Sequence, residues 1–325
     1  MKTCLHLVIF GSFVGLRIST LPIGIPEKKH RGLVVIPGVG NAKRLNNTFA
    51  NMQMLKHQRN AYIEWDCLVF IYANRQQSKE FWNSSLIKPL KLLCLVRECP
   101  NCLIVENLRN LHPHSLKHVY KYVCILLDDV RLKKPPGFSM NRLCEIMKYN
   151  NCTAISPRVR RASRGEEHDG RSLMVEPPIS GTVGFVVAFA ELFAWVMTAK
   201  AYSLLYELLL PAVNPYGWGF DNWYDGYARL RYPETRLCIA SELMVIHLPP
   251  NRFPNGSAIL EDGTPRTEKI NALRRQERYF RDHLGVDLYG RSTERKDGRK
   301  EGSTAGVGAI ERRIYGVLVA PPANH

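Results

Sequence analysis

The feature that most constrains the fold is a short, wholly apolar segment that ends directly on two aspartates. Residues 122 to 127 contain no charged side chain, and Asp128 and Asp129 follow at once. An apolar run of this length, without polar alternation, is typical of a parallel strand covered on both faces. In α/β sheets, ligands bind beyond the carboxyl ends of the strands. The segment therefore predicts a central strand that delivers two carboxylates to the ligand-binding edge of a sheet.

The rest of the chain alternates predicted strands with predicted helices. The other predicted strands cover residues 32–38, 67–72, 102–106, 183–189 and 244–247. The predicted helices cover residues 45–55, 86–95, 140–149, 191–209 and 269–283. This order predicts an α/β fold with a Rossmann-like, doubly wound, mostly parallel sheet and helices on both faces.

The N-terminus resembles a secretory signal. Lys2 precedes an apolar stretch from Leu5 to Leu16, which is shorter than the roughly 20 residues that span a bilayer. We expect residues 1–20 to be a signal peptide or a short signal-anchor, the second of which would attach the chain to a membrane. A linker over 21–31, a main domain over 32–250, a helical extension over 251–289 and a flexible tail over 290–325 would follow.

Sequons and cysteines favour an oxidising compartment. Four glycosylation sequons begin at Asn46, Asn83, Asn151 and Asn255. Eight cysteines follow the signal, an even number that suits disulfides, although the sequence does not give their pairing. Cys99-Pro-Asn-Cys102 has the spacing of metal ligands, but no second pair completes a zinc site. We expect a luminal protein of the Golgi or endoplasmic reticulum, or a secreted one.

The net charge of +16 does not indicate nucleic acid as a partner. The basic residues concentrate in two segments, 158–171 and 266–300, and do not form one face or one DNA-recognition helix. The first segment is predicted to be a solvated loop or, alternatively, one that orders over a diphosphate. The apolar stretch 181–210 is not predicted to span a membrane, because Glu191, Lys200 and Glu207 interrupt it.

The two aspartates are the first candidate site residues. Adjacent carboxylates repel one another, which costs stability unless a cation lies near them. A hard divalent ion such as Mn²⁺ or Mg²⁺ takes oxygen ligands and bridges readily to a diphosphate. Aspartate is also common in turns, where its side chain bonds the local backbone. Asp128 and Asp129 therefore indicate either a metal site or a turn that ends the strand.

An aromatic, glycine-bearing loop and one histidine supply the other candidates. In the loop Tyr216-Gly-Trp-Gly-Phe-Asp221, the glycines allow a ligand close to the backbone, and Asp221 could accept the proton of an attacking hydroxyl. Alternatively, the loop packs on the core and Asp221 caps a helix. His247 ends a predicted strand, where it could bind a metal or a phosphate or be structural.

Together these segments resemble the GT-A class of nucleotide-sugar transferases. In more detail they resemble the plant and algal domain-of-unknown-function family numbered 707, which is regarded as glycosyltransferase-like. The resemblance covers about Gly32 to Pro250. The matched segments are residues 121–130, 154–157, 185–195, 217–221 and 245–248. Members of that family usually show a Trp followed by Asp-Glu-Asp, whereas this chain has Leu127 and only two acids.

The resemblance implies a metal-dependent glycosyltransferase that moves a sugar from a nucleotide-sugar donor to a glycan or other hydroxyl acceptor. By role, its site residues would be the Mn²⁺ or Mg²⁺ ligands Asp129 and His247, the substrate-binding residues Asp128, Trp218 and Gly219, and the general base Asp221. The alternative is a luminal sugar- or glycan-binding relative that keeps the fold without turnover.

Overall fold

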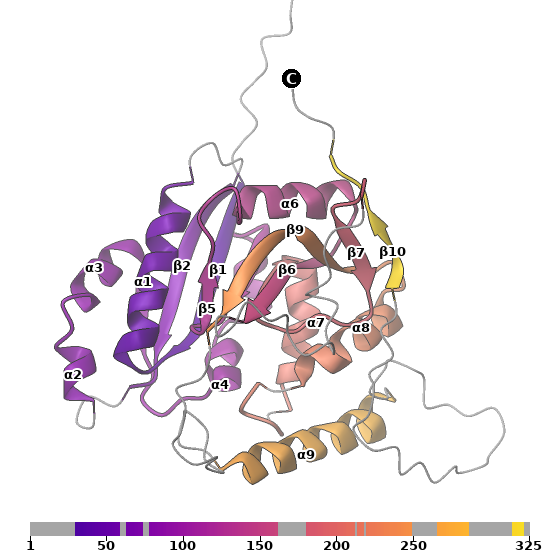
Figure 1. Cartoon of the computed structure of the whole chain (residues 1–325). Coiled ribbons are helices and arrows are strands. Elements are labelled where there is room, and N and C mark those ends of the chain that lie inside the picture. Colours follow the sequence, from indigo (N-terminus) through magenta and orange to yellow (C-terminus); the bar gives the residue numbers. More distant parts are fainter. Residues whose placement is uncertain are drawn as a thin grey trace, which may run out of the picture.

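The computed structural model describes residues 30–58, 63–73, 78–161, 180–211, 213–217, 219–248, 265–285 and 314–321. The predictions for the signal, most of the linker, Asn255, Trp218 and most of the basic loop fall on residues outside these ranges. Within them, the strands form one ten-stranded sheet, which Figure 1 shows through the middle of the molecule.

The strands follow the order β10-β7-β9-β6-β8-β4-β1-β2-β3, and β5 pairs with β9 beside this path. Their bounds are β1 His30–Val39, β2 Ile63–Ile71, β3 Leu95–Glu98, β4 Tyr122–Leu126, β5 Val130–Leu132, β6 Ala154–Arg161, β7 Gly184–Val187, β8 Ala194–Thr198, β9 Leu237–His247 and β10 Ile314–Leu318. The four strands β3, β2, β1 and β4, neighbours in this order in the sheet, are parallel. Beyond β4 the sheet is mixed, because β8 lies antiparallel to both β4 and β6.

Helices pack on both faces of this sheet. Their bounds are α1 Ala42–Lys56, α2 Lys79–Trp82, α3 Ile87–Leu93, α4 Ile104–Arg109, α5 Pro113–Lys117, α6 Met140–Tyr149, α7 Ala199–Leu209, α8 Phe220–Arg231 and α9 Arg266–Leu284. In Figure 1, α6 crosses one end of the molecule and α9 crosses the other. The α/β fold predicted from the alternation of strands and helices is confirmed.

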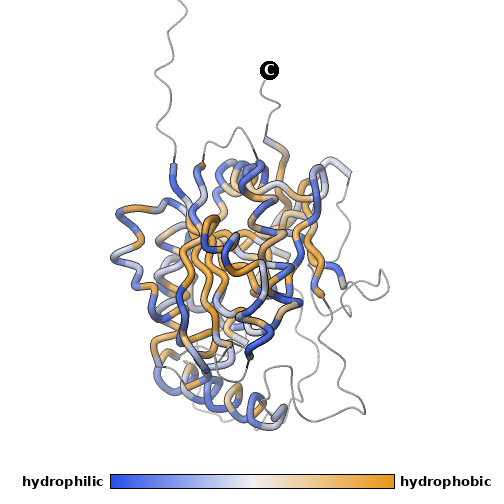
Figure 2. Tube along the Cα trace, turned by 90° about the vertical axis from the view of Figure 1, so that its left-hand side faces the viewer, coloured by the Kyte–Doolittle hydropathy of each residue, from blue (hydrophilic) through white to orange (hydrophobic). Residues whose placement is uncertain are grey.

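The apolar strands form the core, as the uniform hydrophobicity of their sequences predicts. In β4 all five residues are buried, and in β1 the last eight are buried. Burial of one such Val, Ile or Leu side chain contributes about 1.5–3 kcal/mol. Figure 2 shows this core as hydrophobic strands through the centre, with hydrophilic residues along the helix at the lower end.

One predicted strand is wrong. Residues 102–106 do not form a strand, because α4 begins at Ile104 and its N-terminus is capped by Glu106, whose Oε2 accepts a hydrogen bond from Leu103 N at 2.7 Å. The third strand in sequence is β3, and three of its four residues are exposed. An exposed edge strand shows no apolar run, so the hydrophobic pattern did not reveal it.

The helix predicted over residues 191–209 is also corrected. Its first part is the strand β8, which lies between β4 and β6, and α7 begins only after Thr198. The Thr198 side chain accepts a hydrogen bond from Ala201 N at 3.1 Å and so caps α7. A continuous apolar run does not by itself separate a buried strand from a buried helix. Among the described residues, no helix is both long and apolar enough to cross a membrane.

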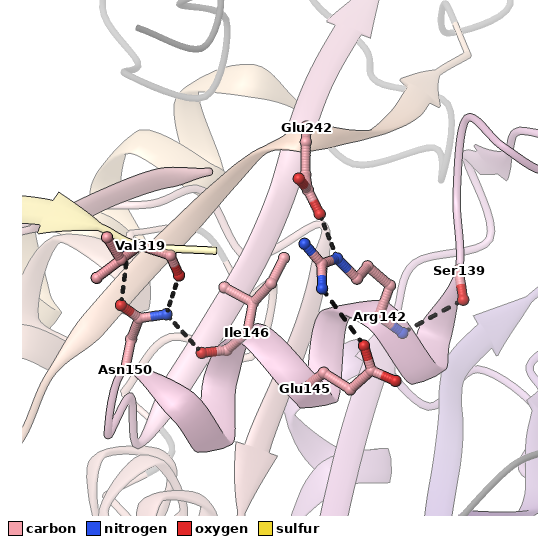
Figure 3. Close-up of polar contacts among 7 residues, drawn as sticks. All are labelled: Ser139, Arg142, Glu145, Ile146, Asn150, Glu242 and Val319. Carbon is pink, nitrogen blue, oxygen red and sulfur yellow. Dashed lines mark hydrogen bonds and ion pairs between the residues drawn. The ribbon is translucent and has the colours of Figure 1, made fainter. Parts of the chain in front are cut away.

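The tail predicted to be flexible contributes a strand to the sheet. Residues 314–318 form β10, which pairs antiparallel with β7. Asn150, at the end of α6, holds the residue after β10: its Nδ2 donates to Val319 O at 3.0 Å and its Oδ1 accepts from Val319 N at 2.9 Å (Figure 3). At the other end of α6, the guanidinium of Arg142 bonds Glu242 of β9 at 2.6 Å. The composition of residues 290–325 predicted disorder because composition alone does not show that β7 and Asn150 would pair with residues 314–319.

Six of the eight cysteines that follow the predicted signal form disulfides, and two remain as thiols. The disulfides are Cys67–Cys94, Cys99–Cys102 and Cys152–Cys238. Cys124 and Cys144 are buried thiols, and burial raises the pKa of Cys124 to about 12. The Cys99-Pro-Asn-Cys102 motif is thus a disulfide in this structure and not a zinc site. By loop-closure entropy, Cys152–Cys238 closes the longest loop and contributes the most stability, about 4–5 kcal/mol.

Replacement of Asn150 tests how β10 is held. In Asn150→Ala both hydrogen bonds to Val319 are lost, at a net cost of about 0.5–1.5 kcal/mol each. We expect hydrogen exchange to accelerate in residues 314–319 and to stay unchanged in β1 and β4. The exposed Tyr149→Ala is the matched control, because its side chain makes no such bond to β10. Equal protection of residues 314–319 in Asn150→Ala and the wild type would contradict this account.

Candidate functional site

The two aspartates lie in a tight turn between β4 and β5. Val130 N donates to Leu127 O at 3.1 Å, so Asp128 and Asp129 occupy the two central positions of the turn. Both side chains are half-buried. The turn lies at the carboxyl end of β4, which is parallel to β1. The predicted position of the two aspartates at the carboxyl end of a central strand is therefore confirmed.

Two buried asparagines of α1 hold this turn. Asn47 Nδ2 donates to Asp128 O at 2.8 Å and to Val130 O at 2.7 Å. Asn51 Nδ2 also donates to Val130 O at 2.7 Å, and its Oδ1 accepts from Leu132 N at 2.9 Å. The backbone on both sides of Asp129 is thereby fixed.

Asn47 and Asn51 were not among the predicted site residues, although the sequence contains a signal for them. Asn47 and Asn51 are four positions apart in a predicted helix, so they share one face with each other and with apolar neighbours. Both are almost fully buried. A pair of amides on a buried helix face indicates that some backbone nearby lacks partners, since buried polar groups are nearly always hydrogen-bonded.

Strand pairing brings His247 to Asp129 from 118 positions away in the sequence. Strand β5 pairs antiparallel with the end of β9, with Val130 opposite His247 (Figure 1). Leu248 N donates to Asp129 O at 2.7 Å. His247 Nε2 lies 3.0 Å from Asp129 Oδ2, and the two side chains are 18% and 24% exposed. The predicted association of Asp129 and His247 is thus present in the structure.

One carboxylate oxygen of Asp129 lacks a hydrogen-bond donor among the described residues. Its Oδ1 is buried and accepts no hydrogen bond from the residues that the structure describes. A buried carboxylate oxygen without a donor costs free energy, and such an atom in a native fold calls for a ligand, an ion or a water. One carboxylate and one imidazole are both divalent-cation ligands. The described residues contain no cluster of three or more such side chains, so within the described part of the chain Asp129 and His247 offer only part of a coordination shell.

Asp221 lies in the first turn of α8, and backbone amides orient its carboxylate. Oδ2 accepts from Leu192 N at 3.3 Å and Oδ1 accepts from Asn222 N at 3.1 Å. Burial raises the pKa of Asp221 to about 6, against the lowering effect of these hydrogen bonds. A carboxylate with a pKa near 6 is mostly ionised at neutral pH and is a better proton acceptor than an ordinary aspartate.

The segment 191–193 connects Asp221 to the aspartate turn. Phe193 O accepts from Leu127 N at 2.9 Å, and the Phe193 ring lies 4.5 Å from the His247 ring, centroid to centroid. The neighbouring residue Leu192 holds Asp221. The structure thus links Asp128, Asp129, Asp221 and His247 through one short segment, whereas Trp218 lies outside the described residues.

The glycine loop before Asp221 requires its glycines. Gly217 and Gly219 have φ of 78° and 81°, a region that side chains strongly disfavour. A Cβ on Gly219 would also lie 2.4 Å from Leu273 of α9. The loop packs closely because α9 covers it. The ring of Phe280 in α9 packs against the rings of Phe220 and Trp223, with centroid distances of 6.2 and 5.2 Å.

Polar contacts with α9 also hold the loop. Asn214 Nδ2 donates to the buried Gln276, and Tyr216 OH donates to Glu268. Lys269 lies over the Tyr216 ring at 5.4 Å. The helix that the sequence predicted as a charged extension therefore supports the loop that carries Asp221.

Comparison with known proteins bears on the fold. No family model matches the sequence, so the resemblance to family 707 is not confirmed, and no curated protein matches. The chain is similar to a crystal structure of GalNAc-T7 with UDP, GalNAc and Mn²⁺, with a TM-score of 0.51 and 10% identity over 79% of this chain and 51% of that one. This likeness confirms a GT-A-like, Rossmann-like α/β fold.

Two further structures are similar at lower scores. They are TarS of S. aureus (TM-score 0.45, 9% identity, 79% of this chain and 44% of that one) and the mannosyltransferase PcManGT from Pyrobaculum calidifontis in complex with GDP-Man and Mn²⁺ (0.42, 14%, 70% and 59%). This chain spans about half the length of each of these relatives.

Asn51→Asp tests whether the asparagines hold the aspartate turn. The carboxylate can still accept from Leu132 N, but it cannot donate to Val130 O, and two acceptors then face each other in a buried place. We expect a loss of about 1–3 kcal/mol in the free energy of unfolding, measured by urea denaturation. Asn46→Asp, on the exposed face of the same helix, should change stability by no more than about 0.5 kcal/mol. Equal stabilities of the two variants would refute the role of Asn51.

Proposed function

We propose that the chain is a glycosyltransferase that moves a sugar from a nucleotide-sugar donor to a hydroxyl of a glycan or other acceptor, with a divalent metal as cofactor. The observation that carries this proposal is the pair formed by Asp129 and His247, whose Oδ2 and Nε2 atoms lie 3.0 Å apart. The other oxygen of Asp129 is buried and accepts no hydrogen bond from the described part of the chain. The pair lies at the edge where α/β sheets bind ligands. The GT-A-like fold agrees with this assignment.

Asp129 and His247 are the residues that would hold the metal. A donor set of one carboxylate and one imidazole suits Mn²⁺ better than Mg²⁺, since imidazole binds transition metals more readily. When bound, such an ion neutralises the charge of a leaving nucleoside diphosphate. Diphosphate oxygens from the donor would complete the partial shell. Asp128, in the same turn, faces the substrate in this proposal, with Gly219 and Trp218 on the acceptor side.

Asp221 acts as the general base in this proposal. Its carboxylate is fixed by two backbone amides and its pKa is raised to about 6 by burial. A fixed base of this strength accepts the proton of the acceptor hydroxyl as the hydroxyl attacks the sugar, which suits a direct displacement. The glycines before Asp221 allow the acceptor close to the backbone.

A second reading is a sugar- or glycan-binding protein without turnover, in the secretory lumen or outside the cell. It is favoured by the small number of ligands: the described residues offer no cluster of three metal-binding side chains. Hydrolysis of a donor nucleotide sugar separates the two readings, because a binding protein leaves the donor intact, whereas transferases slowly pass the sugar to water when no acceptor is present.

Calorimetric titration with UDP and GDP tests the donor site. We expect one of the two nucleotides to bind in Mn²⁺ and to lose at least tenfold in affinity in chelator or in Asp129→Asn, because the variant keeps the shape of the side chain and removes its charge. Glu64→Gln, an exposed carboxylate on β2, is the matched control and should bind as the wild type does. Failure of the folded wild type to bind either nucleotide would overturn the proposal.

The pH dependence of turnover tests Asp221. Because the base must be ionised and its pKa is about 6, turnover should fall about tenfold per pH unit below pH 6 and level off above pH 7. Asp221→Asn should lower turnover about 10²- to 10⁴-fold. Asp225 is the control, because burial also raises its pKa to about 6. The variant Asp225→Asn should keep the fall in turnover below pH 6. An acid limb that persists in Asp221→Asn would exclude Asp221 as the base.

A further inference from the structure

The Cys99–Cys102 disulfide lies at the same edge of the sheet as the aspartate turn. It begins directly after β3, which is parallel to β2, and β2 is parallel to β1. Cys99 N donates to Ile71 O at 2.9 Å and Asn101 N donates to Tyr72 O at 3.1 Å. Asn101 has a φ of 64°, a backbone conformation that non-glycine residues seldom adopt. The disulfide thus closes a tight turn whose backbone bonds the end of β2.

This disulfide is the most accessible of the three in the described structure. Both of its cysteines are half-buried, and the two residues between them are exposed. By contrast, each of the other two disulfides contains at least one buried cysteine: Cys94 is 6% exposed, Cys152 5% and Cys238 0%. Cys67, the partner of Cys94, is half-buried. Exchange with an external thiol requires access to a sulfur atom. A four-residue loop also gains the least stability from closure, so this disulfide contributes less to global stability than the other two.

We propose that Cys99 and Cys102 form a thiol–disulfide exchange site for a dithiol reductant, and that their redox state controls the order of the loop that leads to Asp221. In the reaction, a thiolate of the dithiol attacks one sulfur, the S–S bond breaks and a mixed disulfide forms. The second thiol of the reductant then attacks the mixed disulfide. Two electrons and two protons pass to the pair, which becomes two thiols, and the reductant becomes a disulfide.

Helix α4 links this site to the loop. It begins at Ile104, two residues after Cys102. Val105 N donates to Pro215 O at 3.2 Å, and the Ile104 side chain lies 3.2 Å from where a Cβ on Gly217 would stand. The position of the first turn of α4 therefore sets the position of the loop residues 215–217, which lead to Asp221.

The second turn of α4 is held independently of the disulfide. Asn107 Nδ2 donates to Pro37 O at the end of β1, at 2.8 Å, and Asn107 is fully buried. Reduction should therefore loosen the first turn of α4 and the loop without release of the whole helix. Its effect on turnover rests on the proposed function, but thiol exchange and loop order do not.

Graded reduction of the intact chain tests the exchange site. The folded protein is incubated with increasing dithiothreitol, alkylated, and analysed by mass spectrometry after proteolysis. We expect Cys99 and Cys102 to be alkylated at a dithiothreitol concentration at least tenfold lower than that which exposes Cys94, Cys152 and Cys238. Simultaneous alkylation of all the pairs, only as the protein unfolds, would overturn the proposal.

Hydrogen exchange tests the link to the loop. In the selectively reduced protein and in the variant Cys99→Ser/Cys102→Ser, exchange should accelerate at least threefold at residues 104–105 and 214–221, and stay unchanged at residues 122–126. Unchanged exchange at 214–221 in both samples would refute the link. Neither measurement uses a nucleotide, so either result stands whether or not the donor site is confirmed.

Discussion

The site depends on the hydrogen bonds that two asparagine side chains make to a β-turn. Asn47 and Asn51 satisfy carbonyl groups of Asp128 and Val130 and the amide of Leu132, so the chain can turn sharply between β4 and β5 inside the protein. Because β5 is held in this way, it can pair with the end of β9 and place His247 beside Asp129. Helix α1 thus positions the candidate site, although the proposed chemistry uses none of its residues.

Local patterns in the sequence predicted the parts of the fold that are buried on both sides. The run that ends at Leu127 and the run 32–38 are strands, because an apolar segment bounded by turn residues has few other stable places in an α/β protein. Apolar segments did not predict two other strands, β3 and β8. Strand β3 is exposed, and β8 is as apolar as the helix that follows it, so hydrophobicity alone gave no boundary at Thr198.

The site was predicted less completely than the fold, for a physical reason. Asp129, His247 and Asp221 have the residue types that the proposed chemistry requires, and each follows or begins a regular element, so they could be selected from sequence. The groups that place them act across long distances in the chain. Leu192 orients Asp221, Phe193 lies against His247, and α9 covers the loop through Leu273 and Phe280. No local pattern records these partners.

The late position of β9 in the chain has a consequence for biosynthesis. A ribosome makes Asp129 long before His247, and β9 lies between β6 and β7 in the finished sheet. As the nascent chain emerges, the parallel strands from β1 to β4 can assemble early. At that stage Asp129 has no contact with His247, because β9 has not yet been synthesised. The edge of β7 then stays open until residues 314–318 have been synthesised. The contact between Asp129 and His247 is therefore among the last features that the growing polypeptide acquires.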